Sequence, residues 1–211
     1  GTLFNTPDGK PKGKIPSNVM PTLRPLLISL VNLAVFVFLG AVFPILDPTD
    51  PKFGTAVVLT EAFLAKPWHW RYGYLWLALV VVRQKYYFAW KNSEGANNIW
   101  YNGFEGFDEK GEAKGFENSS NMDILKFETA SNLQTLSKEW NKKTSLWLTR
   151  YVYIRTGGNL AAVYSTSAFW HGFYPGYYLF FLSVPILTFC ERLGRKKISP
   201  YFSEAKWSLY G

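Results

Sequence analysis

A single histidine, His171, lies within a long stretch of the chain, from Thr156 to Cys190, that contains no Lys, Arg, Asp or Glu. A segment of this composition belongs in a bilayer or a deep protein core, and an ionisable group placed there is a candidate functional residue. Its imidazole can accept or donate a proton near neutral pH. His171 is therefore a candidate catalytic residue, although a buried histidine often only bonds to a backbone carbonyl.

Asn141, about thirty residues earlier, is the second polar residue of interest. Apolar residues recur at helical spacing on both sides of it: Leu133, Leu136, Trp140, Trp147, Tyr151 and Ile154. These spacings predict two short amphipathic helices, over 123–140 and 142–155, that meet at Asn141. Taken alone, the asparagine has a purely structural explanation, because it is a favoured N-cap residue.

Two apolar segments upstream predict membrane-spanning helices. Residues 26–46 contain no charged residue and are long enough to cross a hydrocarbon core of about 30 Å. Residues 72–90 are also apolar, but Arg83 and Lys85 interrupt them. This second segment spans a membrane only if its basic side chains reach an interface or face the interior of the protein.

The segment that carries His171, residues 157–190, is too long for one span of roughly 20 residues. Pro175 and Gly176 favour a break, because proline removes a backbone donor and glycine tolerates turn conformations. We therefore expect a re-entrant segment or a pair of membrane helices here. Residues 91–155, which precede it, predict a cytosolic connector that carries the amphipathic helices.

Composition and charge placement support this organisation. The chain has a net charge of +8, with nine Trp, thirteen Tyr and seventeen Phe, and aromatic rings favour membrane interfaces and cavity walls. No basic block has the pattern of a nucleic-acid-binding module, so we expect no nucleic-acid partner. The basic clusters flank the apolar segments, which predicts that they face the cytosol. The expected fold is an all-α, polytopic integral membrane protein.

Two further features restrict the chemistry and the topology. The one cysteine, Cys190, excludes an intrachain disulfide and a multi-cysteine metal site. Residues 118–120, NSS, form the single N-glycosylation acceptor pattern. With the connector in the cytosol, we expect Asn118 to stay unmodified, and a glycan there would overturn the predicted orientation.

Two motifs carry a resemblance to a known family. Residues 140–148 read WNKKTSLWL and residues 167–177 read SAFWHGFYPGY, and together they look like the paired signature of the membrane-bound O-acyltransferases (MBOAT). Upstream, KYYFAW at 85–90 and EGA at 94–96 resemble an additional motif of the lysophospholipid acyltransferase branch. The chain departs from that branch at 99–104, IWYNGF, where a Ser-Gly-Leu-Gly-like run is usual. Family members are much longer, so the resemblance implies that this chain is a C-terminal portion of a helical chamber.

The resemblance implies transfer of a fatty acyl group from acyl-CoA to the free hydroxyl of a lysophospholipid. His171 would be the general base that takes the proton of the hydroxyl. Asn141 matches the second catalytic position of the family, and its amide would orient the ring or hold the developing oxyanion, an effect of about 3 kcal/mol. No metal is expected, since the thioester is already activated and one histidine cannot form a zinc site. Acyl-CoA is a co-substrate, and no other cofactor is expected.

Substrate binding is predicted near these two residues. The polyanionic donor could meet Lys142 and Lys143, with Arg150 and Arg155 nearby, although these charges also suit a cytosolic flank. Aromatic residues of the two motifs could line the acyl and lipid tunnels, or could only pack between helices. These residues are Trp140, Trp147, Trp170 and Tyr174.

Other functions are compatible with the same residues. The fold and the histidine would also serve an acceptor that is a sterol, a diacylglycerol or a protein, and a non-catalytic membrane scaffold would need the fold alone. A transporter is disfavoured, because the sequence has no internal repeat. The resemblance implies residence in the endoplasmic reticulum membrane, with the lipid bilayer as a partner. The head group, the acyl preference and the oligomeric state do not follow from the sequence.

Overall fold

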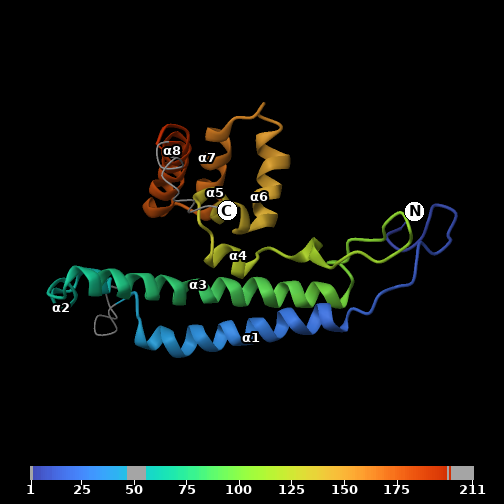
Figure 1. Cartoon of the computed structure of the whole chain (residues 1–211), viewed down its shortest axis with the longest axis horizontal. Helices are drawn as coiled ribbons and strands as arrows, with labels where there is room; N and C mark the ends of the chain where they lie inside the picture. Colours follow the sequence, from blue (N-terminus) through green and yellow to red (C-terminus); the bar gives the residue numbers. More distant parts are fainter. Residues whose placement is uncertain (1, 47–55, 199, 201–211) are drawn as a thin grey trace. The chain divides into compact units, whose positions relative to one another are not determined.

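The computed structural model describes residues 2–46, 56–198 and 200. Every regular element within these residues is helical, and their β pairing is limited to three isolated bridges. The described part of the chain therefore confirms the all-helical prediction. The chain divides into two compact units, residues 1–121 and 122–211, and Figure 1 draws both.

The first unit is built on two long helices, α1 (Val19–Val42) and α3 (Trp68–Ile99). They lie side by side along their lengths and run in opposite directions (Figure 1). The described residues of this unit also form three short helices: η1 (Val57–Leu59), α2 (Glu61–Leu64) and η2 (Glu117–Ser119). Near the start of α3, the Tyr74 hydroxyl donates to the carbonyl of Pro44 at 2.8 Å, which ties α3 to the segment just after α1.

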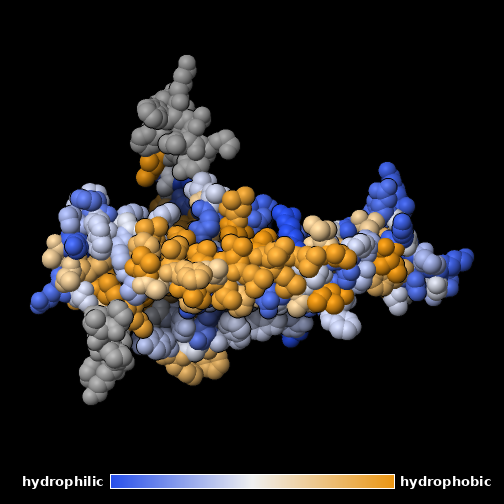
Figure 2. Space-filling view, turned by 90° about the horizontal axis from the view of Figure 1, so that it is seen from below, coloured by the Kyte–Doolittle hydropathy of each residue, from blue (hydrophilic) through white to orange (hydrophobic). Residues whose placement is uncertain are grey.

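Helix α1 turns polar residues toward α3 and apolar residues outward. Ser29 and Asn32 are 1% and 7% exposed, whereas Leu27 and Phe38 are 62% and 73% exposed. This polarity is the reverse of that of an amphipathic helix in water. Figure 2 shows the resulting band of hydrophobic residues along this unit. Among the described helices, α1 alone has the length and composition needed to cross a membrane.

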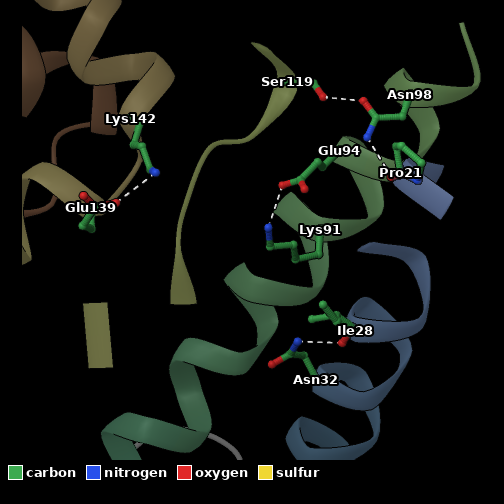
Figure 3. Close-up of polar contacts among 9 residues, drawn as sticks. All are labelled: Pro21, Ile28, Asn32, Lys91, Glu94, Asn98, Ser119, Glu139 and Lys142. Atoms are coloured by element: carbon green, nitrogen blue, oxygen red, sulfur yellow. Dashed lines mark hydrogen bonds and ion pairs between the residues drawn. The ribbon is translucent and has the colours of Figure 1, made fainter. Parts of the chain in front are cut away.

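Helix α1 begins and ends earlier than the expected 26–46 segment. Pro44 accounts for the earlier end, since the residue before a proline is disfavoured in a helical conformation. Pro25 lies inside the helix and has no N–H for the carbonyl of Pro21, its usual partner four residues back. That carbonyl instead accepts a hydrogen bond from Asn98 Nδ2 of α3 at 2.8 Å (Figure 3). The start of α1 is thus stabilised by the neighbouring helix.

Asn98 joins three segments of the first unit near the end of α3. The residue is 1% exposed. Its Oδ1 accepts from Ser119 Oγ at 2.9 Å, and its Nδ2 donates to the Pro21 carbonyl. Asn18 Nδ2 donates to the carbonyls of Asn98 and Ile99, at 3.1 and 2.9 Å. These bonds supply partners at a helix C-terminus, where backbone carbonyls lack intrahelical ones.

Helix α3 is longer than the expected span over 72–90 and continues unbroken past the basic residues at 83–85. Within that stretch, Arg83 Nε donates to the hydroxyl of Tyr87, four residues later, at 3.3 Å. Side-chain pairs at this spacing support a helix, so the basic residues do not interrupt it. Helix α3 does not have the composition of a membrane span within the described part of the chain.

The final turns of α3 lie in the region expected to be a connector, and one face of them is packed, with Glu94, Gly95 and Asn98 buried. Lys91 Nζ is 2.7 Å from Glu94 Oε2, with side chains 14% and 10% exposed (Figure 3). Beside this pair, Gly95 permits a close approach of α1. A Cβ atom there would lie 2.6 Å from Leu26 Cγ and 3.0 Å from the carbonyl oxygen of Thr22.

The second unit consists of short helices that lead into a helical hairpin. In chain order they are α4 (Ile124–Glu128), α5 (Leu133–Glu139), α6 (Lys142–Leu148), the π-helical segment η3 (Thr149–Tyr153), α7 (Leu160–His171) and α8 (Pro175–Lys197). Helix α7 packs against both α8 and η3 (Figure 1). The segment 157–190 therefore holds two helices, and α8 extends beyond it. Gly172, with φ of 106°, ends the first helix, and Pro175 begins the second.

The predicted amphipathic helices are divided more finely in the structure. The segment 123–140 contains two helices because Asp123 and Asn132 each cap one, accepting from backbone N–H groups three residues later at 3.1 and 2.6 Å. The segment 142–155 begins as an α-helix and continues as a π-helix. Single π-helical turns are frequent at functional sites.

Candidate active site

His171 is the last residue of α7, and its hydrogen bond sets the tautomer of its ring. Nδ1 lies 2.6 Å from the carbonyl oxygen of Ser167. A carbonyl only accepts, so Nδ1 carries the hydrogen and the neutral ring has its lone pair on Nε2. The carbonyl bond that offered a purely structural explanation for this histidine thus also prepares Nε2 as an acceptor.

Aromatic rings pack around the half-buried imidazole. The ring centroids of Trp170 and Phe181 are each 4.8 Å from that of His171, and the Tyr177 centroid is 5.6 Å away. Trp170 belongs to α7, whereas Tyr177 and Phe181 lie in the first two turns of α8. The hairpin turn at 172–174 brings α8 back past the end of α7 and limits the orientations open to the ring.

Asn141 forms the turn between α5 and α6 in a left-handed conformation, with φ of 51° and ψ of 50°. Asparagine is one of the few residues besides glycine that adopts this conformation readily. The residue occupies the N-cap position of α6, but its side chain makes no capping bond to the helix backbone. Its Oδ1 instead accepts a hydrogen bond from Thr144 Oγ1 at 2.9 Å. Ordinary N-capping therefore does not account for this side chain.

An ion pair spans the same turn. Glu139 Oε2 is 2.9 Å from Lys142 Nζ (Figure 3), and Glu139 is buried. Burial raises the pKa of nearby Asp123, but hydrogen bonds from Lys126 and the charges of Lys126 and Lys142 more than offset this, so the pKa lies below its ordinary value. The charge of Lys142 is thus engaged by carboxylates of its own chain, which makes it less suited to a substrate phosphate.

A cavity of about 290 Å³ lies between α6 and α7. Its lining residues are Lys143, Thr144, Trp147 and Trp170. Sequence reasoning assigned three of these to substrate binding and missed Thr144. The position of Thr144, three residues after Asn141, could have indicated it. At that spacing on a helix, a side chain reaches back to the residue that begins the helix. The cavity connects the two motifs, since Thr144 bonds to Asn141 and Trp170 neighbours His171.

The other residues predicted to bind substrate do not line this cavity. Trp140 packs on Phe127, with ring centroids 5.0 Å apart. Lys142 pairs with Glu139, and Tyr174 is exposed beside Tyr177. The structure therefore separates the predicted set into residues that surround a cavity and residues that hold neighbouring elements in place.

A stack of side chains leads away from the cavity along α6 and η3. The Trp147 ring, which lines the cavity, stacks on Tyr151 with centroids 6.2 Å apart. The guanidinium of Arg155 lies 5.2 Å from the centroid of the Tyr151 ring. This arrangement places Arg155 on the same stripe as a cavity-lining indole. Arg150 lies within η3, and both arginines are exposed.

The sequence of the chain matches "MBOAT, membrane-bound O-acyltransferase family" over residues 27–206. It is 38% identical over 138 residues to membrane-bound glycerophospholipid O-acyltransferase 2 of Homo sapiens, which covers 65% of this chain and 26% of that protein. It is 32% identical over 192 residues to membrane-bound glycerophospholipid O-acyltransferase 1 of Mus musculus, covering 90% and 37%. It is 29% identical over 195 residues to the lysophospholipid acyltransferase of Schizosaccharomyces pombe, covering 89% and 36%.

These matches confirm the family resemblance that the motifs indicated. The family match contains Asn141, His171 and all four residues that line the cavity. The chain spans between about a quarter and somewhat more than a third of the length of these relatives. The chain belongs to the membrane-bound O-acyltransferase family, and its relatives lie in the lysophospholipid acyltransferase branch.

Proposed function

We propose that the protein containing this chain transfers a fatty acyl group from acyl-CoA to the free hydroxyl of a lysophospholipid, with His171 as general base. The observation that carries the proposal is the tautomer of the His171 imidazole, which is set by its hydrogen bond. Nδ1 is held by the Ser167 carbonyl, and Nε2 is an acceptor at the end of a helix whose Trp170 lines the cavity. The names of the relatives support a lysophospholipid as the acceptor.

The chemistry requires removal of one proton. An alcohol is a weak nucleophile at neutral pH, so its proton must be taken as its oxygen attacks the thioester carbon. His171 Nε2 accepts this proton, and the Nδ1 bond to Ser167 supports the imidazolium that forms. The ester C–O bond forms as the C–S bond breaks, and the proton passes to the thiolate of CoA. The amide N–H groups of Asn141 stabilise the oxyanion during the attack.

The cavity residues suit the reacting ends of the two substrates. A volume of about 290 Å³ is at the lower end of small-ligand sites and too small for a whole lipid. The indoles of Trp147 and Trp170 offer apolar walls to the acyl chain next to its reacting carbon. Lys143 at the cavity and Arg155 on the adjoining stripe would meet the phosphates of CoA.

We further propose that α1 crosses the membrane of the endoplasmic reticulum within a polytopic protein, and that α3, whose composition alone is not that of a span, crosses with it as the packed partner in an antiparallel hairpin. The support is the reversed polarity of α1, which exposes leucine, valine and phenylalanine and buries Ser29 and Asn32 against α3. In a bilayer, polar groups must be satisfied within the protein, and the apolar face then contacts lipid. Absence of a glycan on Asn118, checked by glycosidase digestion, is expected for a cytosolic connector.

The test measures acyl transfer by the full-length protein in microsomal membranes. Oleoyl-CoA is offered with a panel of lysophospholipids, and separately with a sterol and a diacylglycerol, and products are read by mass spectrometry. We expect His171→Ala to lower lysophospholipid acylation by about 100-fold or more. Asn141→Gly, which keeps the left-handed backbone conformation, should lower it by about 100-fold. The control is His69→Ala, the other histidine, which is exposed near the start of α3.

The outcomes separate the alternatives. Acylation of the sterol or diacylglycerol alone would keep the mechanism and replace the acceptor. Full activity of His171→Ala in protein that is still expressed and membrane-inserted would reject the proposal, and it is the result expected of a non-catalytic scaffold. A loss of equal size in His69→Ala would show that the assay reports general damage instead of chemistry.

A further inference from the structure

We propose that Thr144 is a positioning residue that sets the orientation of the Asn141 amide for acyl transfer. This inference rests on the proposed function of the site. Its basis is the hydrogen bond from Thr144 Oγ1 to Asn141 Oδ1 at 2.9 Å, together with the place of Thr144 in the lining of the cavity.

The two ends of an asparagine amide are opposite in chemistry and similar in shape. The oxygen only accepts, the nitrogen only donates, and the terminal torsion is broad and roughly two-fold. With Oδ1 bonded to the Thr144 hydroxyl, Nδ2 lies on the opposite side of Cγ. An amide turned by half a rotation would present oxygen where nitrogen now lies, and oxygen repels a developing oxyanion. In the observed arrangement the hydroxyl donates to Oδ1, so it holds the amide with its N–H donors turned to the other side, where they serve the reaction.

The structure around Thr144 and Asn141 fixes their positions relative to each other. Thr144 lies on the first turn of α6, so the helix backbone fixes where its hydroxyl points. The left-handed backbone of Asn141 and the ion pair between Glu139 and Lys142 hold the turn on the other side. A hydrogen bond between two such restrained groups is pre-organised, which is what lets a positioning residue act on a reaction rate.

The test compares two substitutions of Thr144 in the full-length protein. Thr144→Val keeps the branched shape and removes the hydroxyl, and we expect kcat to fall by about 3- to 10-fold, the effect of one hydrogen bond. KM for both substrates should stay near the wild-type value, because the cavity keeps its shape. Thr144→Ser keeps the hydroxyl and should recover most of the rate. Thr149→Val is the matched control, since the hydroxyl of Thr149 donates to the Ser145 carbonyl at 2.9 Å.

A double substitution assigns the effect to the amide. Thr144→Val in an Asn141→Gly background should cause no further loss, because the group that it positions is absent. An undiminished loss in that background, a change in KM with kcat preserved, or failure of Thr144→Ser to recover the rate would each overturn the inference. If Thr144→Val does not accumulate, Thr144→Ala serves as the second variant without a hydroxyl. Full activity of both His171→Ala and Asn141→Gly would instead reject the proposed function itself.

Discussion

The two units use their polar side chains in different ways. In the first unit, Asn98 and Asn18 bond to the backbone at helix ends, and Lys91 and Glu94 pair with each other. In the second unit, His171 and Asn141 stand at the ends of short helices, where a turn rather than a long packed interface orients them.

This difference has a physical origin. A pair of long helices with apolar outer faces must satisfy its inward polar groups internally, so each such group becomes part of the packing. A group at a turn between short helices is oriented by backbone conformation and can stay partly exposed, as Asn141 and His171 do. We therefore expect substitutions in the first unit to change stability with little effect on the chemical step, and substitutions at the turns of the second unit to do the reverse.

The largest effect is expected at Asn141. Asp tolerates the left-handed conformation and retains an oxygen for the Thr144 hydroxyl, but it has no N–H group and carries a negative charge. Asn141→Asp should therefore lower kcat by about 100-fold, or about 3 kcal/mol in the barrier, while thermal unfolding in detergent stays near the wild-type temperature. A strongly lowered unfolding temperature would show that Asn141 contributes mainly to stability, as the polar residues of the first unit do. It would contradict the expected difference between the two units.

The next effect is expected at Gly95, where the helices of the first unit approach closely. Gly95→Ala places a Cβ atom 2.6 Å from Leu26 Cγ and should cost about 2 kcal/mol of stability. Gly73→Ala is the matched control, because nothing lies within 4 Å of its added Cβ, and alanine in a helix should stabilise by about 0.5–1 kcal/mol. Both are measured by thermal unfolding in detergent. Equal shifts in the two variants would show that the close approach does not contribute to stability.

A somewhat smaller effect is expected at Asn98. Asn98→Ala leaves the Pro21 carbonyl and the Ser119 hydroxyl without this partner, and we expect a loss of about 1–2 kcal/mol. Asn92→Ala, an exposed asparagine of the same helix, should change stability by less than about 0.5 kcal/mol. Acyl transfer measured at a temperature where both variants remain folded should match the wild type. A lowered kcat in Asn98→Ala under those conditions would show that the first unit also affects the acyl-transfer step.

Part of the fold was accessible from the sequence, for reasons that are local. The uncharged run over 26–46 predicts a long apolar helix because composition and length suffice, and Pro175 with Gly176 predicts a break between two elements because proline removes a backbone donor. The continuation of α3 to Ile99 was missed, since the polar residues in that stretch suggested a solvated connector. Two of them are instead buried, with Glu94 paired to Lys91 and Asn98 bonded to Pro21.

The sequence by itself determined the family and the two candidate residues, Asn141 and His171, because their types and spacing within the two motifs are specific. Only the tertiary structure decided the tautomer of His171, the orientation of the Asn141 amide and that Lys143, and not Lys142, lines the cavity. These features depend on dihedral angles and on side chains from other turns of the chain. The bond from Asn98 to Pro21, 77 positions apart, has the same origin: a carbonyl left without its helical partner by one proline finds a donor only after the two helices pack.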